Sequence, residues 1–292
     1  TITKVSMLNG SVWSTVKSIK NKDDQFTLET PTAIMGVRGT NLQVRVNPIT
    51  GGSTFIIASG LGRITPTNTA QGDEILLYPS QQISIDGGNG QQNPQQDVHF
   101  VDLDELIQNA SPALIAAIIK SKEMIDQENE ELLARLKQEL EQGQPDSNLD
   151  LKNQDDLDRY SRNLEFLIGN IIKDALKNNK IGKDELDRLI EEENKKLTKK
   201  IDLDNVVPPE LTDREKQKLE LAKKQQKERE EQARLLKEQE LQRQQFEILN
   251  RLEEIRKKQE EANRLALAEK SRKAIEEYEN QLNELERRKF EE

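Results

Sequence analysis

The feature that most constrains the fold is a C-terminal stretch without helix breakers. From residue 210 to residue 292 the sequence contains neither glycine nor proline, and Glu, Lys, Gln, Arg, Leu and Ala dominate it. These residues have the highest helix propensities. Thr212 and Glu215 stand three residues apart at its start, the spacing of a capping box. We therefore predict a long charged helix over residues 212–292, about 120 Å in length at the usual rise per residue.

Apolar side chains in this stretch follow a heptad-like spacing over part of its length. Steps of four and three residues place them at the a and d positions of a coiled coil. The predicted oligomerisation seam consists of Ile248, Leu252, Ile255, Ala262, Ile275, Tyr278, Leu282 and Leu285. Its phase slips near residues 265–268, which would change the supercoil locally. Residues 223–232 have no seam, so we expect them to stay largely solvated or to pack marginally, while the distal part binds a second copy of the chain.

The N-terminal third has a different composition. Residues 1–100 hold 11 of the 14 glycines and equal numbers of acidic and basic residues, so the net charge of −10 falls on the rest of the chain. Short β-branched runs are separated by turn signals about every ten residues, which predicts a small antiparallel β-sandwich or roll over residues 1–86. Leu42, Val44 and Val46 alternate with polar residues, as in a half-buried strand.

Between these regions the sequence predicts two linkers and a helical region. Residues 87–101 are rich in Gly, Gln and Asn, the composition of a flexible linker. Amphipathic stripes over 111–142, 155–178 and 183–197 predict a helical hairpin or small bundle within residues 102–200. Residues 201–211 contain two prolines and form a second linker. The fold class is therefore multidomain α and β: a β-module, a helical region and a long coiled-coil helix.

Composition excludes several functional classes. The chain has no cysteine and one histidine, which excludes thiolate chemistry and leaves little room for a metal site or histidine catalysis. No apolar run exceeds seven residues, so we expect no transmembrane segment. The acidic balance disfavours nucleic-acid binding. Asp102, Asp104 and Glu105 could form an acid pair of the glycosidase kind, but a helix-capping role is favoured. We expect no enzyme activity, no catalytic residue, no cofactor and no metal.

The most specific motif is the string TPTAIMGVRGT at residues 30–40. Its two glycines, Gly36 and Gly39, bracket Val37 and Arg38 at a bend that leads into the alternating strand. Arg38 has a structural role or binds a ligand, and the structural role is favoured. The string resembles the signature of the FecR-type domain of bacterial envelope proteins. The matching signature residues are Thr30, Pro31, Gly36, Val37, Arg38, Gly39 and Thr40.

Two flanking segments extend this resemblance to about residues 2–86. Residues 7–13 (MLNGSVW) are similar to the turn before the signature strand, and residues 57–60 with 78–82 are similar to the closing strands. The family's module usually begins several strands further upstream. We therefore expect the sequence to begin inside a longer or processed polypeptide that lacks the module's N-terminal strands.

The resemblance implies an all-β module of non-enzymatic function and export to the bacterial periplasm or cell surface. Two functions follow from it as expectations. In the first, the protein is a structural or assembly scaffold of a cell-envelope complex, whose β-module docks to other envelope proteins while the helix oligomerises. In the second, it is an envelope signal sensor or transducer of the iron-siderophore regulator type.

Overall fold

The computed structural model describes residues 2–17, 25–67, 74–86, 94–146 and 148–291. The chain forms two compact units, Thr1–Glu231 and Gln232–Glu292. In the described residues, the first contains a β-sheet, five whole α-helices and the start of a sixth, and the second is helical over its described length. The predicted class, a β-module followed by helices and a long C-terminal helix, is confirmed.

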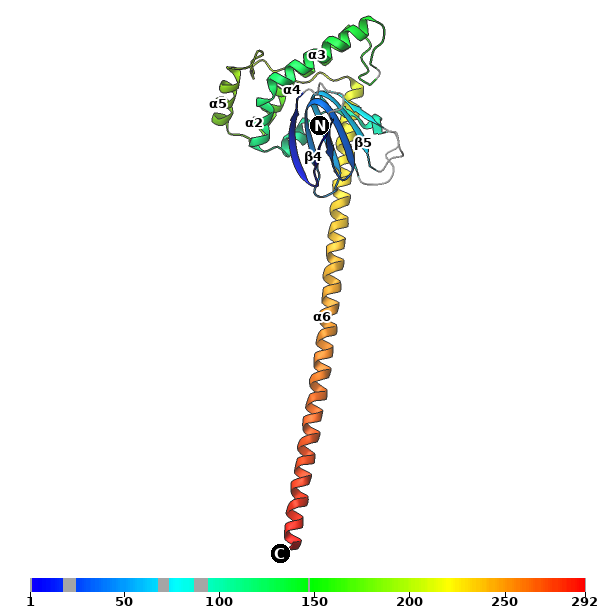
Figure 1. Ribbon diagram of the computed structural model, residues 1–292, viewed down its shortest axis with the longest axis vertical. Helices are drawn as coiled ribbons and strands as arrows, with labels where there is room; N and C mark the ends of the chain where they lie inside the picture. The colour runs from blue at the N-terminus through cyan, green and yellow to red at the C-terminus, as the bar shows by residue number, and fades with distance from the viewer. Residues whose placement is uncertain (1, 18–24, 68–73, 87–93, 147, 292) are drawn as a thin grey trace. The chain divides into compact units, whose positions relative to one another are not determined.

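The first unit is built on one eight-stranded sheet that curls around its own apolar face (Figure 1). Its order is β1-β3-β4-β5-β7-β8, with β2 paired to β4 and β6 paired to β5. The pairing of β1 with β3 is parallel and the other pairings are antiparallel. The strands are β1 Ile2–Ser6, β2 Gly10–Val16, β3 Gln25–Glu29, β4 Ala33–Val46, β5 Ser53–Pro66, β6 Ile75–Leu77, β7 Gln81–Ile85 and β8 His99–Phe100.

A β-bulge in β4 explains how the sheet curls. The first half of β4 pairs with β3 up to Val37, and its second half pairs with β2 from Thr40 onward, while β5 lies along its other edge. The register shifts between these two residues, where Gly39 has a φ of 110°. Opposite it, Gly60 has a φ of 78°, and a Cβ there would lie 2.1 Å from the Gly39 carbonyl oxygen. Both conformations favour glycine, so one long strand can serve two partners along the same edge.

Three apolar clusters hold the first unit together. The concave face of the sheet encloses one, which includes Leu42, Val44 and Phe55. The outer face contributes Ile56 and Ala58 to a second, which α1, α2, α4 and α5 complete. A third joins the region of β6 and β7 to α3 and α4. The sheet and the helices therefore share a core, because neither could bury its apolar residues alone.

Several of the helices begin at side-chain caps. The helices are α1 Leu103–Gln108, α2 Pro112–Lys120, α3 Lys122–Glu141, α4 Gln154–Lys177, α5 Lys183–Asn194 and α6 Asp213–Glu291. Ser111 caps α2 with Pro112 at the first helical position, as predicted, and Asp102 caps α1. The prediction of a single helix over 111–142 is wrong, because the chain breaks at Ser121. The Ser121 hydroxyl lies 2.8 Å from the Ala117 carbonyl and 3.2 Å from the Trp13 indole nitrogen.

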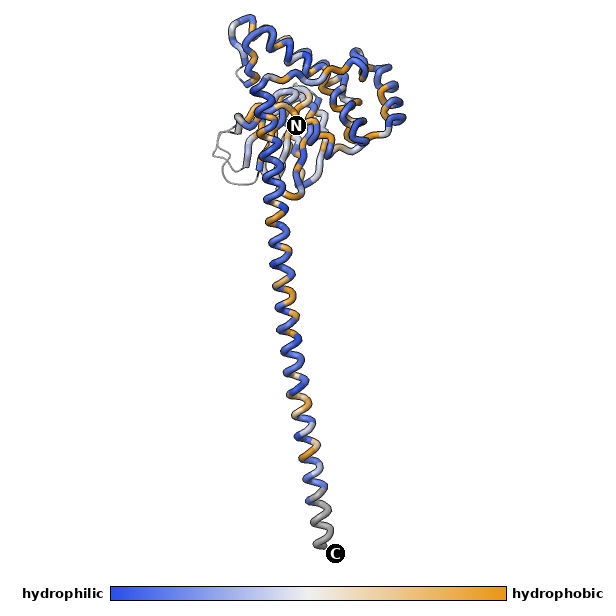
Figure 2. The backbone as a smooth tube through the Cα atoms, turned by 180° about the vertical axis from the view of Figure 1, so that it is seen from behind, coloured by the Kyte–Doolittle hydropathy of each residue, from blue (hydrophilic) through white to orange (hydrophobic). Residues whose placement is uncertain are grey.

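The segment before α6 is fastened to α4. Asn163 of α4 makes two hydrogen bonds with the backbone of Glu210, accepting from its N–H at 2.8 Å and donating to its carbonyl at 2.9 Å. The predicted capping box forms at the start of α6, since Thr212 and Glu215 exchange hydrogen bonds. Hydrophilic residues dominate α6, with apolar residues scattered along it (Figure 2). In the described part of the chain, no helix is long and apolar enough to cross a membrane.

Candidate functional site

The outer face of the sheet carries a row of polar side chains that is buried beneath helices. Alternation along β4 sends Leu42 and Val44 into the concave core, and Gln43 and Arg45 to the opposite face. The same alternation in β7 brings Gln82 to that face. This polar strip consists of Asn41, Gln43, Arg45, Asn47, Thr54, Ser59, Gln82 and Ser84. The strand that the alternation predicts as half-buried is therefore covered on both faces. The sequence pattern could not reveal this, because the helices that cover the outer face come from distant parts of the chain.

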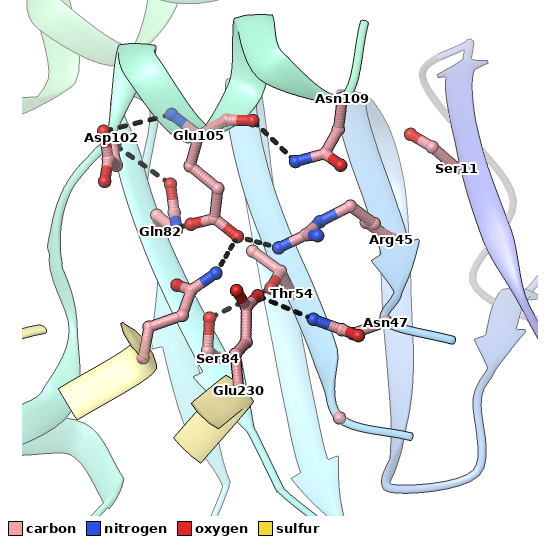
Figure 3. A network of polar contacts seen from close by, with 12 residues as sticks. Ser11, Arg45, Asn47, Thr54, Gln82, Ser84, Asp102, Glu105, Asn109 and Glu230 are labelled. Carbon is pink, nitrogen blue, oxygen red and sulfur yellow. Dashed lines mark hydrogen bonds and ion pairs between the residues drawn. The ribbon is translucent and has the colours of Figure 1, made fainter. Parts of the chain in front are cut away.

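An ion pair between Arg45 and Glu105 of α1 lies at the centre of the polar strip (Figure 3). Their side chains are only 11% and 9% exposed. The other Glu105 oxygen accepts a hydrogen bond from the Gln82 amide at 2.7 Å. Burial lowers the pKa of Arg45, and the negative charge of Glu230 partly offsets this effect. A buried pair of this kind needs further hydrogen bonds to offset the cost of desolvation, and Gln82 supplies one.

The N-terminal cap of α1 positions Glu105 over the sheet. The Asp102 carboxylate accepts from the Glu105 backbone N–H at 3.2 Å, and the Asp102 backbone N–H donates to the Gln82 side chain at 3.0 Å. The capping role predicted for this acidic segment is thus confirmed for Asp102. Glu105 belongs to the buried ion pair, which the sequence did not predict because Arg45 is 60 residues away along the chain.

The first turns of α6 cover one side of the polar strip. Gln226 donates to the Glu105 carboxylate at 2.7 Å, and Glu230 accepts from Asn47 at 2.8 Å. Arg229 forms an ion pair with Asp86 at 2.6 Å. Burial raises the pKa of Asp86, and Arg229 partly offsets the shift. Residues 223–231 therefore pack against the rest of the first unit through polar groups.

Further along the sheet, the bulge in β4 forms one wall of an open groove with a volume of about 370 Å³. Gly39 and Gly60 line it, opposite Glu128, Glu131 and Arg135 of α3. The Glu128 carboxylate accepts from the Ser59 hydroxyl at 2.5 Å and from the Asn41 amide at 3.3 Å. Burial raises the pKa of Glu128. These contacts join α3 to the sheet.

The residues that match the FecR-type string lie at the bend of the sheet and in the turn before it. The Thr30 hydroxyl bonds the Ala33 backbone and closes the turn that holds Pro31, ahead of β4. Val37 is buried, and Gly36, Gly39 and Thr40 lie in β4 around the bulge. The side chain of Arg38 lies outside the described set, so the choice between its two predicted roles stays open.

The predicted oligomerisation seam lies on the helix of the second unit. The described side chains of its larger members, Ile248, Leu252, Ile255, Ile275 and Tyr278, are 54–64% exposed, and Ala262 is exposed too. The side chains of Leu282 and Leu285 lie outside the described residues. Among the described side chains of this helix, seven more large apolar ones are exposed, namely Leu235, Leu236, Leu241, Phe246, Leu249, Leu265 and Leu267. The apolar residues are therefore spread beyond a single stripe.

The acidic side chains of Asp102 and Glu105 and the single histidine make hydrogen bonds and ion pairs within the fold. Within the described residues, no three His, Cys, Asp or Glu side chains are grouped so as to hold a metal ion. His99 is buried with its Nδ1 2.7 Å from the Phe100 carbonyl, and burial lowers its pKa. Glu105 and Asp102 are held by hydrogen bonds within the fold.

The comparisons with known proteins give little. No protein-family model matches the sequence, and no curated protein matches it. Two crystal structures of a candidate anti-sigma factor from Parabacteroides distasonis are 19% identical to the chain, with a TM-score of 0.26. The match covers 32% of this chain and 44% of that one, so less than half of the neighbour's length is spanned. A likeness this slight carries no argument about fold or function.

Proposed function

We propose that this chain is a non-enzymatic assembly protein of the bacterial cell envelope, and that the helix of its second unit binds the same helix of a second copy. The exposed seam carries this proposal. Ile248, Leu252 and Ile255 follow one another at steps of four and three residues, and more than half of each side chain is exposed. A helix this polar gains little from its own ion pairs, so burying the seam is the main stabilisation available to it.

Charges beside the seam predict how such a pair would respond to salt. With Leu252 at an a position and Ile255 at a d position, Arg251 and Lys258 occupy g positions and Arg256 an e position. In a parallel pair in register, Arg251 of one copy faces Arg256 of the other. Like charges repel, and salt screens exposed charges. Self-association should therefore strengthen as salt rises, whereas binding of this helix to an acidic partner would weaken.

The test is the molar mass of the full chain in solution, measured by sedimentation equilibrium at about 0.05 M and about 0.5 M salt. We expect a multiple of the chain mass, favoured at the higher salt. Ile255→Glu keeps helix propensity but puts a charge in the seam. It should raise the dissociation constant roughly 100-fold, because both copies lose about 1.5 kcal/mol of apolar burial.

Leu236→Glu is the matched control. Leu236 is also more than half exposed, but it falls on the face opposite the seam when the heptad is extended back, so its replacement should leave the mass unchanged. Circular dichroism checks that both variants remain helical. A chain that is monomeric at high micromolar concentration in both salts would refute the proposal and favour the envelope signal sensor instead.

The remaining parts of the proposal concern location and partners. The resemblance of residues 2–86 to envelope modules supports export to the periplasm or cell surface, and docking of the β-module to other envelope proteins. Fractionation of cells that express the full-length protein tests the compartment. Recovery in the cytosolic fraction would overturn this part without affecting self-association.

A further inference from the structure

The contact between the first turns of α6 and the rest of the first unit differs in kind from the contacts that hold the unit together. None of the three apolar clusters includes a described residue from Asp213 onward. The partly buried residues of α6 before Gln232 recur at spacings of three and four positions, and most of them are polar. They are Glu215, Lys218, Leu219, Ala222, Lys223, Gln225, Gln226, Arg229 and Glu230.

Charge complementarity dominates this contact. Lys223 lies 3.5 Å from Asp102 and 3.1 Å from Asp104, while Arg229 lies 2.6 Å from Asp86. Both basic residues of α6 therefore lie next to acidic residues in the rest of the first unit. These side chains are partly exposed, so salt reaches them and weakens their attraction. An apolar contact has no such dependence.

When α6 is absent, Glu105 and Asn47 lose the hydrogen bonds that they make with Gln226 and Glu230, but they keep others within the rest of the first unit. Glu105 retains Arg45 and Gln82, and Asn47 still accepts from the Ile49 backbone N–H at 2.8 Å. On the helix side, Gln226 and Arg229 would meet water instead of protein. Separation of α6 from the rest of the first unit therefore leaves no charge buried without a partner. Under this condition both a docked and a released position of α6 are accessible.

A fixed point and a pivot precede the segment. Asn163 holds the backbone of Glu210 on α4, and Arg162 pairs with the Glu210 carboxylate at 3.0 Å. The helix starts three residues later, at Asp213. Rotation of the backbone between Glu210 and Asp213 would move the helix as a rigid element without disturbing the anchored segment.

We propose that residues 213–231 are an ionic latch: a helical segment that docks over the polar strip through Lys223, Gln226, Arg229 and Glu230, and that releases as ionic strength rises or as a polyelectrolyte competes for its charges. Release uncovers Arg45, Asn47 and Glu105. The latch involves the first unit alone and does not depend on self-association of the second.

Spin labels measure the latch directly, because the chain has no native cysteine. One label at Ile49→Cys on the sheet unit and one at Lys227→Cys on the exposed face of α6 report their separation by pulsed dipolar spectroscopy of the full chain. Excess unlabelled protein removes distances between copies. A second pair, Ile49→Cys with Lys173→Cys on α4, is the internal control and should stay constant.

We expect one narrow distance at about 0.02 M salt and a second, broader population at about 0.5 M. Arg229→Glu should raise the ratio of released to docked molecules by a factor of roughly 5 to 30 at low salt. Adding Asp86→Lys should restore the narrow distance by reversing the pair. Lys224→Glu, which changes an outward-facing residue with an ion pair to Glu228 only, should have no effect.

Two results would overturn the latch. One is a single narrow distance under all these conditions, including Arg229→Glu. The other is release by Arg229→Glu that the Asp86→Lys swap does not reverse while the control pair also broadens, since that pattern indicates general unfolding. Because the readout is a distance within one chain, it stays valid whether or not the protein self-associates.

Discussion

Replacing Glu105 by leucine leaves the Arg45 guanidinium buried without its carboxylate. The two side chains are only 11% and 9% exposed, so the pair belongs to the buried class. Removing one partner of such a pair typically costs about 3–5 kcal/mol, against about 0–1 kcal/mol for an exposed pair. For a unit of this size each kcal/mol lowers the melting temperature by about 2–4 °C. We therefore expect Glu105→Leu to lower it by roughly 6–20 °C.

Fluorescence of the single tryptophan provides the assay. Trp13 packs against the cluster formed by the helices and donates to Ser121, so its emission reports the folding of the first unit. Denaturant unfolding of the full chain, followed by this emission, then gives the free energy of unfolding of the first unit. Arg63→Leu is the control: Arg63 pairs with Glu74 at 2.8 Å, but the two side chains are 58% and 47% exposed. Its effect should stay within about 1 kcal/mol.

The double variant Arg45→Met with Glu105→Leu separates the cost of an orphaned charge from the worth of the pair. Replacing both partners by apolar residues of similar size leaves no unpaired ion. We expect the double variant to be more stable than Glu105→Leu alone. The burial argument is wrong if Glu105→Leu costs less than about 1 kcal/mol. It is also wrong if the destabilisations caused by Arg45→Met alone and Glu105→Leu alone add up in the double variant.

Two further predictions concern the groove beside the bulge. Gly60→Ala should destabilise the first unit by at least about 2 kcal/mol, because the φ of Gly60 is positive and the new Cβ would meet the Gly39 carbonyl. Gly36→Ala is the control: no atom lies within 4 Å of the new Cβ, so stability should change by less than about 1 kcal/mol. Equal effects of the two substitutions in chemical denaturation would contradict this account. Burial raises the pKa of Glu128, so the folded state binds this proton more tightly than the unfolded state, and stability is lost as pH rises through the folded pKa. Glu128→Gln should therefore stabilise the protein at neutral pH and make its melting temperature depend less on pH between about pH 4 and 7. A variant less stable than the parent at pH 7 would refute the prediction.

Much of the local structure could be predicted because its causes are local. The absence of Gly and Pro after residue 210, together with the capping box at Thr212, gives both the existence of α6 and its start. The alternation around Val44 gives a strand whose apolar face packs inward. The Gly39 bend follows from the need for a positive φ. In each case the determining interaction spans only a few residues, so the pattern is visible in the chain.

The tertiary structure decided which polar groups meet. Alternation places Arg45 on the face opposite the core, but it cannot tell whether water or helix covers that face. Glu105 stands 60 residues away and Gln226 a further 121 residues beyond it, and neither position carries a signal that marks it as a partner. The hydrogen bond from Trp13 to Ser121 likewise joins segments that are far apart in the chain. Helices and caps are fixed by neighbours in sequence, whereas buried ion pairs are fixed by packing, which brings distant segments together.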